Sequence, residues 1–172
     1  MTVQIDTREK ARAIKRIIAD FDERGVKHYS SKLFVGDYMN LDNPRVLIDR
    51  KQNLLELCTN VSDIPKKDGS GRFKRDAAGK IMSERARFVS ELARARDAGL
   101  QLIILCEHGY GIKSMEDVAK WENPRLATSP LAVSGDRLYK ILTAVSQNYG
   151  VRFEFCDKKN TADTILKLLG GK

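Results

Sequence analysis

The sequence predicts an α/β fold in which helices cover both faces of a central sheet. Segments with apolar residues at helical spacing alternate along the chain with short runs of β-branched and apolar residues, which is typical of such layered folds. The run over residues 100–106 is apolar almost throughout, as expected for a central strand buried on both faces. The chain has 172 residues, without an evident internal repeat or a long linker, so we expect one domain over residues 1–172.

The first half of the chain is divided by glycines and by one Asn-Pro pair. Apolar residues recur at helical spacing up to Gly25, which is a typical helix end. Gly36 is expected to bend an extended segment, and Asn43-Pro44 predicts a turn. The expected elements are a strand at residues 3–6, a helix from Arg8, extended segments over residues 27–33 and 33–41, a strand at residues 46–49 and a short helix over residues 52–58.

The second half contains one segment unlike its surroundings. Residues 62–80 combine proline and glycine with many basic side chains, which predicts a mobile basic loop. Helical periodicity returns at Ser83 and ends at Gly99. The elements expected after Gly99 are a strand at residues 100–106, helices over residues 114–120 and 137–149, a strand at residues 151–155 and a helix over residues 160–169.

The composition is basic and shows no sign of a membrane span. Lys and Arg number 31 against 23 Asp and Glu, which gives a formal net charge of +8. Such a surplus favours a polyanionic partner, most often nucleic acid, although many basic proteins bind none. No stretch of about eighteen apolar residues is present, and the N-terminal residues lack the pattern of a signal peptide. Because the three cysteines form no CxxC pair, we expect a cytoplasmic protein without membrane association or structural zinc.

The candidate chemistry lies on two neighbouring extended segments. Asp37 follows Gly36 in one, and Asp49 and Lys51 end the other. Because side chains alternate along a strand, residues 49 and 51 face the same way, about 7 Å apart along the strand, whereas Arg50 faces the opposite way. If the two segments pair, Asp37 approaches the same point, and two carboxylates lie beside one ammonium group.

Two carboxylates beside a lysine suit the hydrolysis of a phosphodiester. Magnesium prefers oxygen ligands, often one or two carboxylates, and keeps waters for substrate oxygens. The ion neutralises developing charge and lowers the pKa of a bound water. We therefore expect Mg²⁺ or Mn²⁺ at Asp37 and Asp49, with Asp6 as a third possible ligand and Lys51 orienting the water. A D-x-K triplet alone is usually a salt-bridged strand end, but the Gly-Asp pair and the apolar strand before it favour catalysis.

Four motifs, in order, resemble those of one nuclease family. Gly36-Asp37-Tyr38 followed by residues 46–51 looks like the GDx(n)ERKx(3)D signature of the XPF-type structure-specific nucleases. Residues 5–9 are similar to that family's first strand, Arg87-Phe88 and the strand after it to its later helix and central strand, and residues 153–162 to its close. The resemblance covers nearly the whole chain except residues 62–80. It implies a restriction-endonuclease-like mixed central sheet flanked by helices on both faces.

The resemblance also implies a metal-dependent DNA endonuclease, in a small free-standing version. By position, the metal-binding and catalytic residues of the family correspond to Asp37, Asp49, Lys51 and Asp6. Arg50 resembles an arginine that points away from the metal and supports the site. Arg87 resembles an arginine near the bound phosphate.

Two positions depart from the signature. Asp49 stands where the family has Glu, and the last acid of the signature falls at Leu55. The adjacent Glu56 is expected to face a different side of its helix, so it is not assigned that role. Leu55 supports an alternative function, a nuclease fold whose catalysis has lapsed and which serves as a DNA-binding or partner subunit. An RNA-directed nuclease ranks last, because no RNA-specific motif is present.

The basic loop is a candidate DNA-contacting arm. Its Lys and Arg side chains would contact phosphates and give salt-dependent affinity without sequence preference, and the alternative is a solvated loop with no partner. The expected DNA-binding residues are Arg50, Lys66, Lys67, Arg72, Lys74, Arg75 and Arg87. DNA is therefore the expected partner, and a homodimer that grips two duplex arms is left open.

Overall fold

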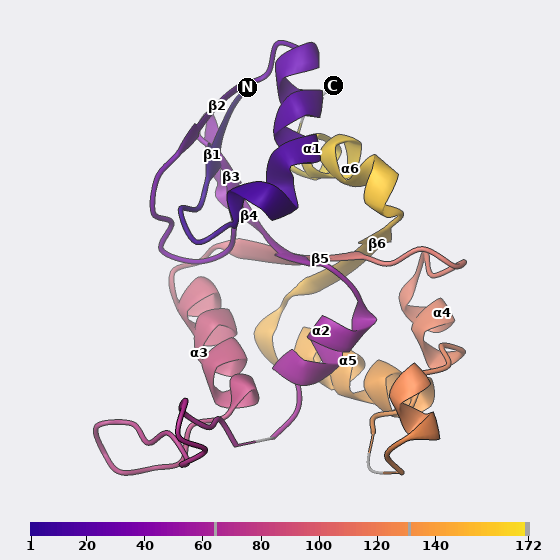
Figure 1. Cartoon of the computed structure of the whole chain (residues 1–172). Helices are drawn as coiled ribbons and strands as arrows, with labels where there is room; N and C mark the ends of the chain where they lie inside the picture. Colours follow the sequence, from indigo (N-terminus) through magenta and orange to yellow (C-terminus); the bar gives the residue numbers. More distant parts are fainter. Residues whose placement is uncertain (64, 131, 171–172) are drawn as a thin grey trace.

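A computed structural model describes residues 1–63, 65–130 and 132–170, which form one mixed sheet with helices on both faces (Figure 1). The sheet has six strands in the order β2-β1-β3-β4-β5-β6. They are β1 (Thr2–Ile5), β2 (Lys27–Ser30), β3 (Tyr38–Asn40), β4 (Asn43–Lys51), β5 (Gln101–Glu107) and β6 (Arg152–Cys156). The β1/β3 and β3/β4 pairs are antiparallel, and the other neighbours are parallel. The predicted mixed α/β sheet is confirmed.

Within the described ranges, each face of the sheet has its own helices and its own hydrophobic cluster. One face holds α1 (Ala11–Glu23) and α6 (Thr161–Leu168) (Figure 1). The other holds α2 (Leu54–Asn60), α3 (Glu84–Asp97), α4 (Met115–Ala119) and α5 (Gly135–Tyr149). The 3-10 helices η1 (Pro124–Ala127) and η2 (Lys158–Asn160) lie in connections. No helix in these ranges has both the length and the apolar character needed to cross a membrane.

Strand β5 is the central strand that its apolar run predicts. Leu102 and Ile104 point into the cluster beneath α2, α3 and α5, whereas Ile103 and Leu105 point into the cluster beneath α1 and α6. All four side chains are buried. This period-two division between the two faces fixes the register of β4, which pairs with β5 in parallel from Val46 onward.

The hairpin between β3 and β4 differs from the prediction. The turn lies at residues 41–42, and Asn43 already pairs with Asn40. The prediction of a turn at Asn43-Pro44 is therefore wrong. The side chain of Asn40 forms the turn instead, because its Oδ1 accepts a hydrogen bond from the backbone N–H of Asp42 at 3.0 Å. As a result β4 starts earlier than expected and runs from the hairpin directly to the predicted site residues.

The segment between α2 and α3 is more structured than a plain loop. We call residues 65–83 the basic arm. The arm begins and ends at nearly the same place, because Pro65 forms a β-bridge with Ser83, the N-cap residue of α3. Three backbone hydrogen bonds join its strands in a ring: Lys66 N–H to Met82 O, Met82 N–H to Lys74 O, and Lys74 N–H to Lys66 O, at 2.8–2.9 Å. Mobility of this segment stays a prediction, and Ile64 lies outside the described residues.

The basic arm also contains a short repeat that the sequence analysis missed. Two turns share the order Asp, two residues, Gly, a basic residue and an apolar residue. In the first, Asp68 Oδ1 accepts from the backbone N–H of Ser70 and of Arg72. In the second, Asp76 Oδ1 accepts in the same way from Ala78 and Lys80. The expectation of no internal repeat is therefore wrong at this local scale.

Candidate active site

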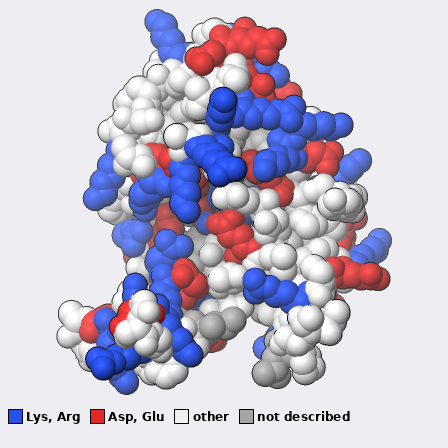
Figure 2. All heavy atoms as spheres, in the orientation of Figure 1, with Lys and Arg blue, Asp and Glu red and all other residues white. Residues whose placement is uncertain are grey.

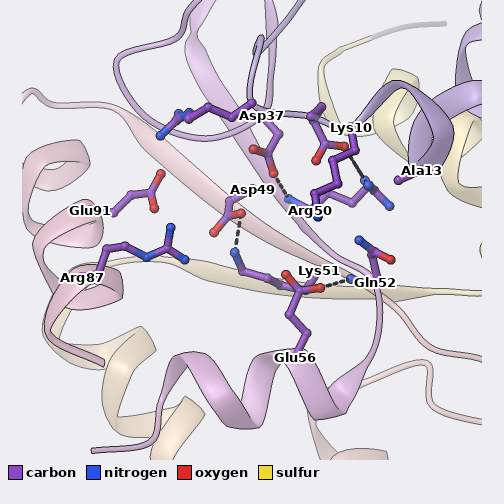
Figure 3. A pocket seen from close by; sticks show the side chains of 12 residues that line it. Lys10, Ala13, Asp37, Asp49, Arg50, Lys51, Gln52, Glu56, Arg87 and Glu91 are labelled. Carbon is purple, nitrogen blue, oxygen red and sulfur yellow. Dashed lines mark hydrogen bonds and ion pairs between the residues drawn. The ribbon is translucent and has the colours of Figure 1, made fainter. Parts of the chain in front are cut away.

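A cleft of about 420 Å³ opens where β4 ends. Strand β4 supplies its floor, and α1, α2, α3 and the loop before β3 supply its walls (Figure 3). The lining residues are Arg8, Glu9, Lys10, Ala13, Asp37, Asp49, Arg50, Lys51, Gln52, Glu56, Arg87 and Glu91. In Figure 2, acidic side chains lie in the hollow near the middle of this face and basic side chains border it. The cleft thus brings together the main predicted site residues.

Asp49 and Lys51 face the cleft on the same side of β4, as their spacing predicts. Lys51 Nζ donates to Asp49 Oδ1 at 2.6 Å. Both side chains are buried, and Asp49 is only 3% exposed. The second oxygen of this carboxylate, Oδ2, is buried and has no hydrogen-bond partner among the described residues. A buried carboxylate oxygen without a partner carries a free-energy cost that a cation in the cleft would remove.

Asp37 is held beside Asp49 by the backbone of β4. Its N–H donates to the carbonyl of Ile48 at 2.7 Å, and its Oδ2 accepts from the N–H of Arg50 at 2.8 Å. This close approach requires Gly36, which has φ +72°, and a Cβ on Gly36 would lie 3.0 Å from the carbonyl oxygen of Ile48. The Gly-Asp pair of the sequence therefore has a direct structural reason.

The electrostatics of the cleft favour a positive ion. Burial raises the pKa of Asp37 well above its ordinary value, and the negative charges of Asp49 and Glu9 raise it further. Lys51 and the N–H of Arg50 act in the opposite direction but do not cancel this effect. Burial alone would lower the pKa of Lys51, but Asp49 and Asp37 outweigh it and leave that pKa raised. Lys51 is therefore an ammonium group at neutral pH.

The donor set fits Mg²⁺ or Mn²⁺ through two carboxylates. Over the ranges that the structure describes, no group of three or more His, Cys, Asp or Glu side chains is placed to hold a metal ion. Mg²⁺ does not need three protein ligands, because it usually binds one or two carboxylates and keeps its waters. Two carboxylates that share a cation are expected to show both features when no cation is bound: an oxygen without a partner, as in Asp49, and a raised pKa, as in Asp37.

Arg50 is not placed to bind DNA, so that prediction is corrected. Its guanidinium lies on the opposite side of β4, where Nη2 is 2.7 Å from Glu9 Oε2 and Nη1 is 3.1 Å from Glu107 Oε1. The residue is 4% exposed. Tyr38 donates its hydroxyl to the same Glu9 oxygen at 3.0 Å. Arg50 thus joins the loop before α1 to β4 and β5 beneath the cleft, in the supporting position that the resemblance implies.

Asp6 is also corrected, because both of its carboxylate oxygens are already bound. Oδ1 accepts from Arg8 Nε at 2.6 Å and Oδ2 accepts from the backbone N–H of Leu33 at 2.6 Å. Burial alone would raise the pKa of Asp6, but the hydrogen bonds from Arg8 and Leu33 outweigh it and lower that pKa. Asp6 does not line the cleft. It fixes the loop between β2 and β3 instead of contributing a metal ligand.

Glu56 faces the cleft, contrary to expectation, and Leu55 does not line it. The carboxylate of Glu56 points toward Lys51 (Figure 3), and its Oε2 accepts from the backbone N–H of Gln52 at 2.8 Å. Helix α2 begins after Asn53, whose side chain caps it by accepting from the N–H of Glu56. An acid is therefore present near the place where the signature has its last one, one residue further along the chain.

Helix α3 brings two charged side chains to the cleft. Arg87 was predicted near a bound phosphate, and it lines the cleft with its side chain 59% exposed and 3.3 Å from Glu84. Glu91 was missed, and its Oε1 accepts from the backbone N–H of Gly36 at 3.1 Å. The two positions are four residues apart, so they share one helix face. That spacing is the sequence signal that points to Glu91 once Arg87 is placed at the site.

The model of the ERCC4 domain matches residues 5–168, which is nearly the whole chain. The chain belongs to the ERCC4 domain family. This ERCC4 domain is similar in structure to XPF from Aeropyrum pernix, with a TM-score of 0.61, 19% sequence identity and coverage of 98% of this chain and 63% of that one. XPF from the same organism in complex with DNA matches with a TM-score of 0.59, 18% identity and coverage of 98% and 62%.

These similarities establish the family and the fold of this ERCC4 domain. The predicted family resemblance is confirmed, and so is the mixed central sheet flanked by helices, which is similar to the fold of XPF. The chain spans somewhat less than two thirds of the length of the two XPF structures. No curated protein matches it.

The basic arm of this ERCC4 domain extends from the N-terminal end of α3, at the lower left of Figure 1, and many basic side chains gather at the same place in Figure 2. Lys66 is tied to α3, because its Nζ is 2.7 Å from Glu84 Oε1. Lys67 lies over the ring of Phe73, 5.6 Å from its centroid. The remaining predicted DNA-binding residues of the arm, which are exposed, are Arg72, Lys74 and Arg75.

Proposed function

We propose that this ERCC4 domain is a DNA endonuclease that requires Mg²⁺ or Mn²⁺ and selects for DNA structure. The observation that carries the proposal is the buried Asp49, with one oxygen bound to Lys51 and the other unpartnered, beside Asp37. Family membership supports the nuclease class, and the similar XPF structure in complex with DNA supports DNA as the partner. The formal net charge of +8 agrees with a polyanionic substrate.

The side chains divide the work of hydrolysis among them. Asp37 and Asp49 would hold the ion, which when bound supplies positive charge and lowers the pKa of a water. Lys51 is an ammonium group, so it acts as a hydrogen-bond donor that orients the water or offsets charge on the phosphate, and not as a general base. Arg87 is exposed at the rim and available to a phosphate oxygen. Arg50 keeps β4 in position beneath them.

The alternative is a DNA-binding or partner subunit without catalysis, which Leu55 favours. Glu56 weakens this alternative, since its carboxylate lines the cleft next to Lys51. A homodimer and a cytoplasmic location stay predictions. The oligomeric state can be measured by light scattering of the purified protein.

A cleavage panel tests the proposal. Linear, nicked, flapped and forked DNA are incubated with the protein in Mg²⁺, in Mn²⁺ and in a chelator. We expect metal-dependent cleavage that Asp49→Ala, Asp37→Ala and Lys51→Ala abolish, while circular dichroism shows an intact fold. Salt-sensitive binding to these DNAs without cleavage in either metal would support the non-catalytic alternative. Absence of both binding and cleavage would exclude the DNA-directed function.

A further inference from the structure

An exposed aromatic ring lies on the loop between β2 and β3, three residues before the cleft residue Asp37. Phe34 is 63% exposed, whereas its neighbours Leu33 and Val35 are buried. The loop is fixed on both sides of the ring. Leu33 donates its N–H to Asp6 Oδ2 at 2.6 Å, and Gly36 donates its N–H to Glu91 Oε1 at 3.1 Å. Phe34 is therefore held outward by anchored neighbours, two residues before Gly36.

The ring has a cationic partner on helix α3. The guanidinium of Arg94 lies 5.9 Å from the centroid of Phe34. Arg94 shares a helix stripe with Arg87 and Glu91, because the three positions follow the i, i+4, i+7 spacing. With a rise of about 1.5 Å per residue, Arg94 lies roughly 10 Å along the axis from Arg87. The ring and the basic arm thus lie at opposite ends of a stripe that passes the cleft.

Single exposed apolar side chains are ordinary on protein surfaces, so exposure alone decides nothing. Phe34 differs from Tyr110, which is fully exposed on the loop between β5 and α4. Phe34 combines a rigid attachment, a guanidinium at cation–π distance and a place on the loop that supplies Asp37 to the cleft. Proteins bind unpaired nucleic acid with aromatic rings on which bases stack, next to cationic groups that bind the backbone.

We propose that Phe34 and Arg94 form a stacking platform for an unpaired base of the DNA strand whose phosphate enters the cleft. This inference rests on the proposed function and adds a recognition site to it. Bases in an intact duplex already stack on their neighbours and offer no free face without unstacking. The platform therefore favours DNA with unpaired nucleotides near the cleavage position, such as a flap, a fork or a gap.

The test measures binding in a chelator, so that no cleavage occurs. The probes are a single-stranded oligonucleotide and a fully paired duplex of the same length, each with one 2-aminopurine whose fluorescence reports stacking. The main variant is Phe34→Leu, which keeps an apolar side chain but removes the aromatic face. Phe34→Tyr keeps the face, and Tyr110→Ala is the control for loss of an exposed aromatic elsewhere.

We expect Phe34→Leu to weaken single-strand binding about tenfold, about 1.4 kcal/mol, and to remove the fluorescence change. Duplex affinity is expected to stay within about twofold, because paired bases do not use the platform. Phe34→Tyr should restore both signals, and Tyr110→Ala should leave them unchanged.

The outcomes separate this inference from the proposed function. If the unmodified protein binds and cuts DNA but Phe34→Leu binds the single strand normally, the platform is wrong and the nuclease stands. Equal weakening for single strand and duplex would also overturn the platform, since Phe34 would then act on binding in general. If the unmodified protein binds neither probe and cuts no DNA in Mg²⁺ or Mn²⁺, the proposed function fails first. A melting curve of Phe34→Leu shows whether the fold is intact.

Discussion

Lys51 Nζ lies 2.6 Å from one oxygen of Asp49, while the other oxygen of the same carboxylate is buried without a partner in the described structure. The protein therefore provides a hydrogen-bond partner for only one of the two oxygens of Asp49. Its free oxygen faces the same cleft as Asp37, whose carboxyl group already experiences the charge of Asp49.

Replacing Asp49 with Asn should remove the metal site and leave the fold intact. The side chain keeps its shape, but the charge that attracts a divalent ion is lost. Cleavage is expected to fall by at least about a hundredfold, the scale of losing one group that stabilises charge in the transition state. Isothermal titration with Mn²⁺ is the second measurement, and it should show no binding to Asp49→Asn. Normal titration by this variant would contradict the assignment of Asp49 as a ligand.

Asp37→Asn should stabilise the metal-free protein at neutral pH. The pKa of Asp37 is raised in the folded state by burial and by Asp49 and Glu9. Stability from such a group is full below its unfolded pKa of about 3.9 and is lost as the pH rises through the folded pKa. The unmodified protein in chelator should therefore lose stability as the pH rises from about 4 toward neutrality, and the variant should lose less.

The gain of Asp37→Asn should grow as the pH rises, because ionisation of Asp37 costs folding free energy in the unmodified protein and the variant has no such charge. Thermal melts in chelator over a pH series measure the gain as an upward shift in Tm. Saturating Mg²⁺ should reverse the order, since only the unmodified protein gains stability from the ion. A variant that melts lower than the unmodified protein in chelator would show that the repulsion is unimportant.

Arg50 and Arg87 both line the cleft, but we expect substitution of Arg50 to lower stability and substitution of Arg87 to lower DNA affinity and cleavage. Arg50→Met leaves Glu9 and Glu107 buried without their cation, so the free energy of unfolding should fall by about 3–5 kcal/mol. Arg87→Ala removes an exposed side chain, so stability should stay within about 0.5 kcal/mol, while DNA affinity and cleavage decrease. Denaturant titrations and DNA binding measured on both variants distinguish the two roles. A stable Arg50→Met with reduced DNA affinity would restore the original prediction for Arg50.

Glu56 should matter for cleavage, and Leu55 should not. Glu56→Gln removes a negative charge that lines the cleft near Lys51, and we expect cleavage to fall between about tenfold and a hundredfold. Leu55→Ala is the matched control on the same helix. Adding Leu55→Asp to the Glu56→Gln variant restores the last acid of the signature. This second substitution should not rescue the cleavage rate, because position 55 does not line the cleft. Rescue by Leu55→Asp would place the missing acid at position 55 after all.

The exposed basic side chains of the arm should contribute to DNA affinity through phosphate contacts. The double variant Arg72→Ala, Lys74→Ala should bind DNA more weakly and reduce the slope of log affinity against log salt by about 1 to 2, since each phosphate contact adds about 0.9. A matched double variant, Arg24→Ala with Lys27→Ala, removes the same charge near the other end of the molecule. Equal slopes for the two double variants would mean that the arm acts only through net charge.

Local spacing predicted the floor of the site but not its walls. Asp49 and Lys51 lie on one strand, so the period of two fixed their common direction. Gly36 and Asp37 were recognised from their place before the apolar strand and from the family signature, and the structure shows that a close approach needs a glycine there. In contrast, the partners of Asp6 include the backbone of Leu33, and only the folded loop shows that its carboxylate is fully bound.

The remaining misses have the same physical origin. Which side of α2 faces the cleft depends on the connection at Gln52 and Asn53, so the direction of Glu56 could not be read from helical spacing alone. Glu91 reaches Gly36 across 55 positions of the chain. The basic composition of residues 62–80 was evident, but its ring of backbone hydrogen bonds depends on three segments meeting in space.

The bridge between Pro65 and Ser83 means that the basic arm leaves and re-enters the fold at nearly one point. Its internal hydrogen bonds do not include the side chains of the cleft. Such a self-contained excursion is a natural grafting position, where a short turn or an unrelated binding peptide can replace the residues between Pro65 and Ser83, so that Ser83 still caps α3. Under the proposed function, the arm that would bind DNA and the cleft that would cut it could then be exchanged independently, so that the target preference could be altered without changing the cleft.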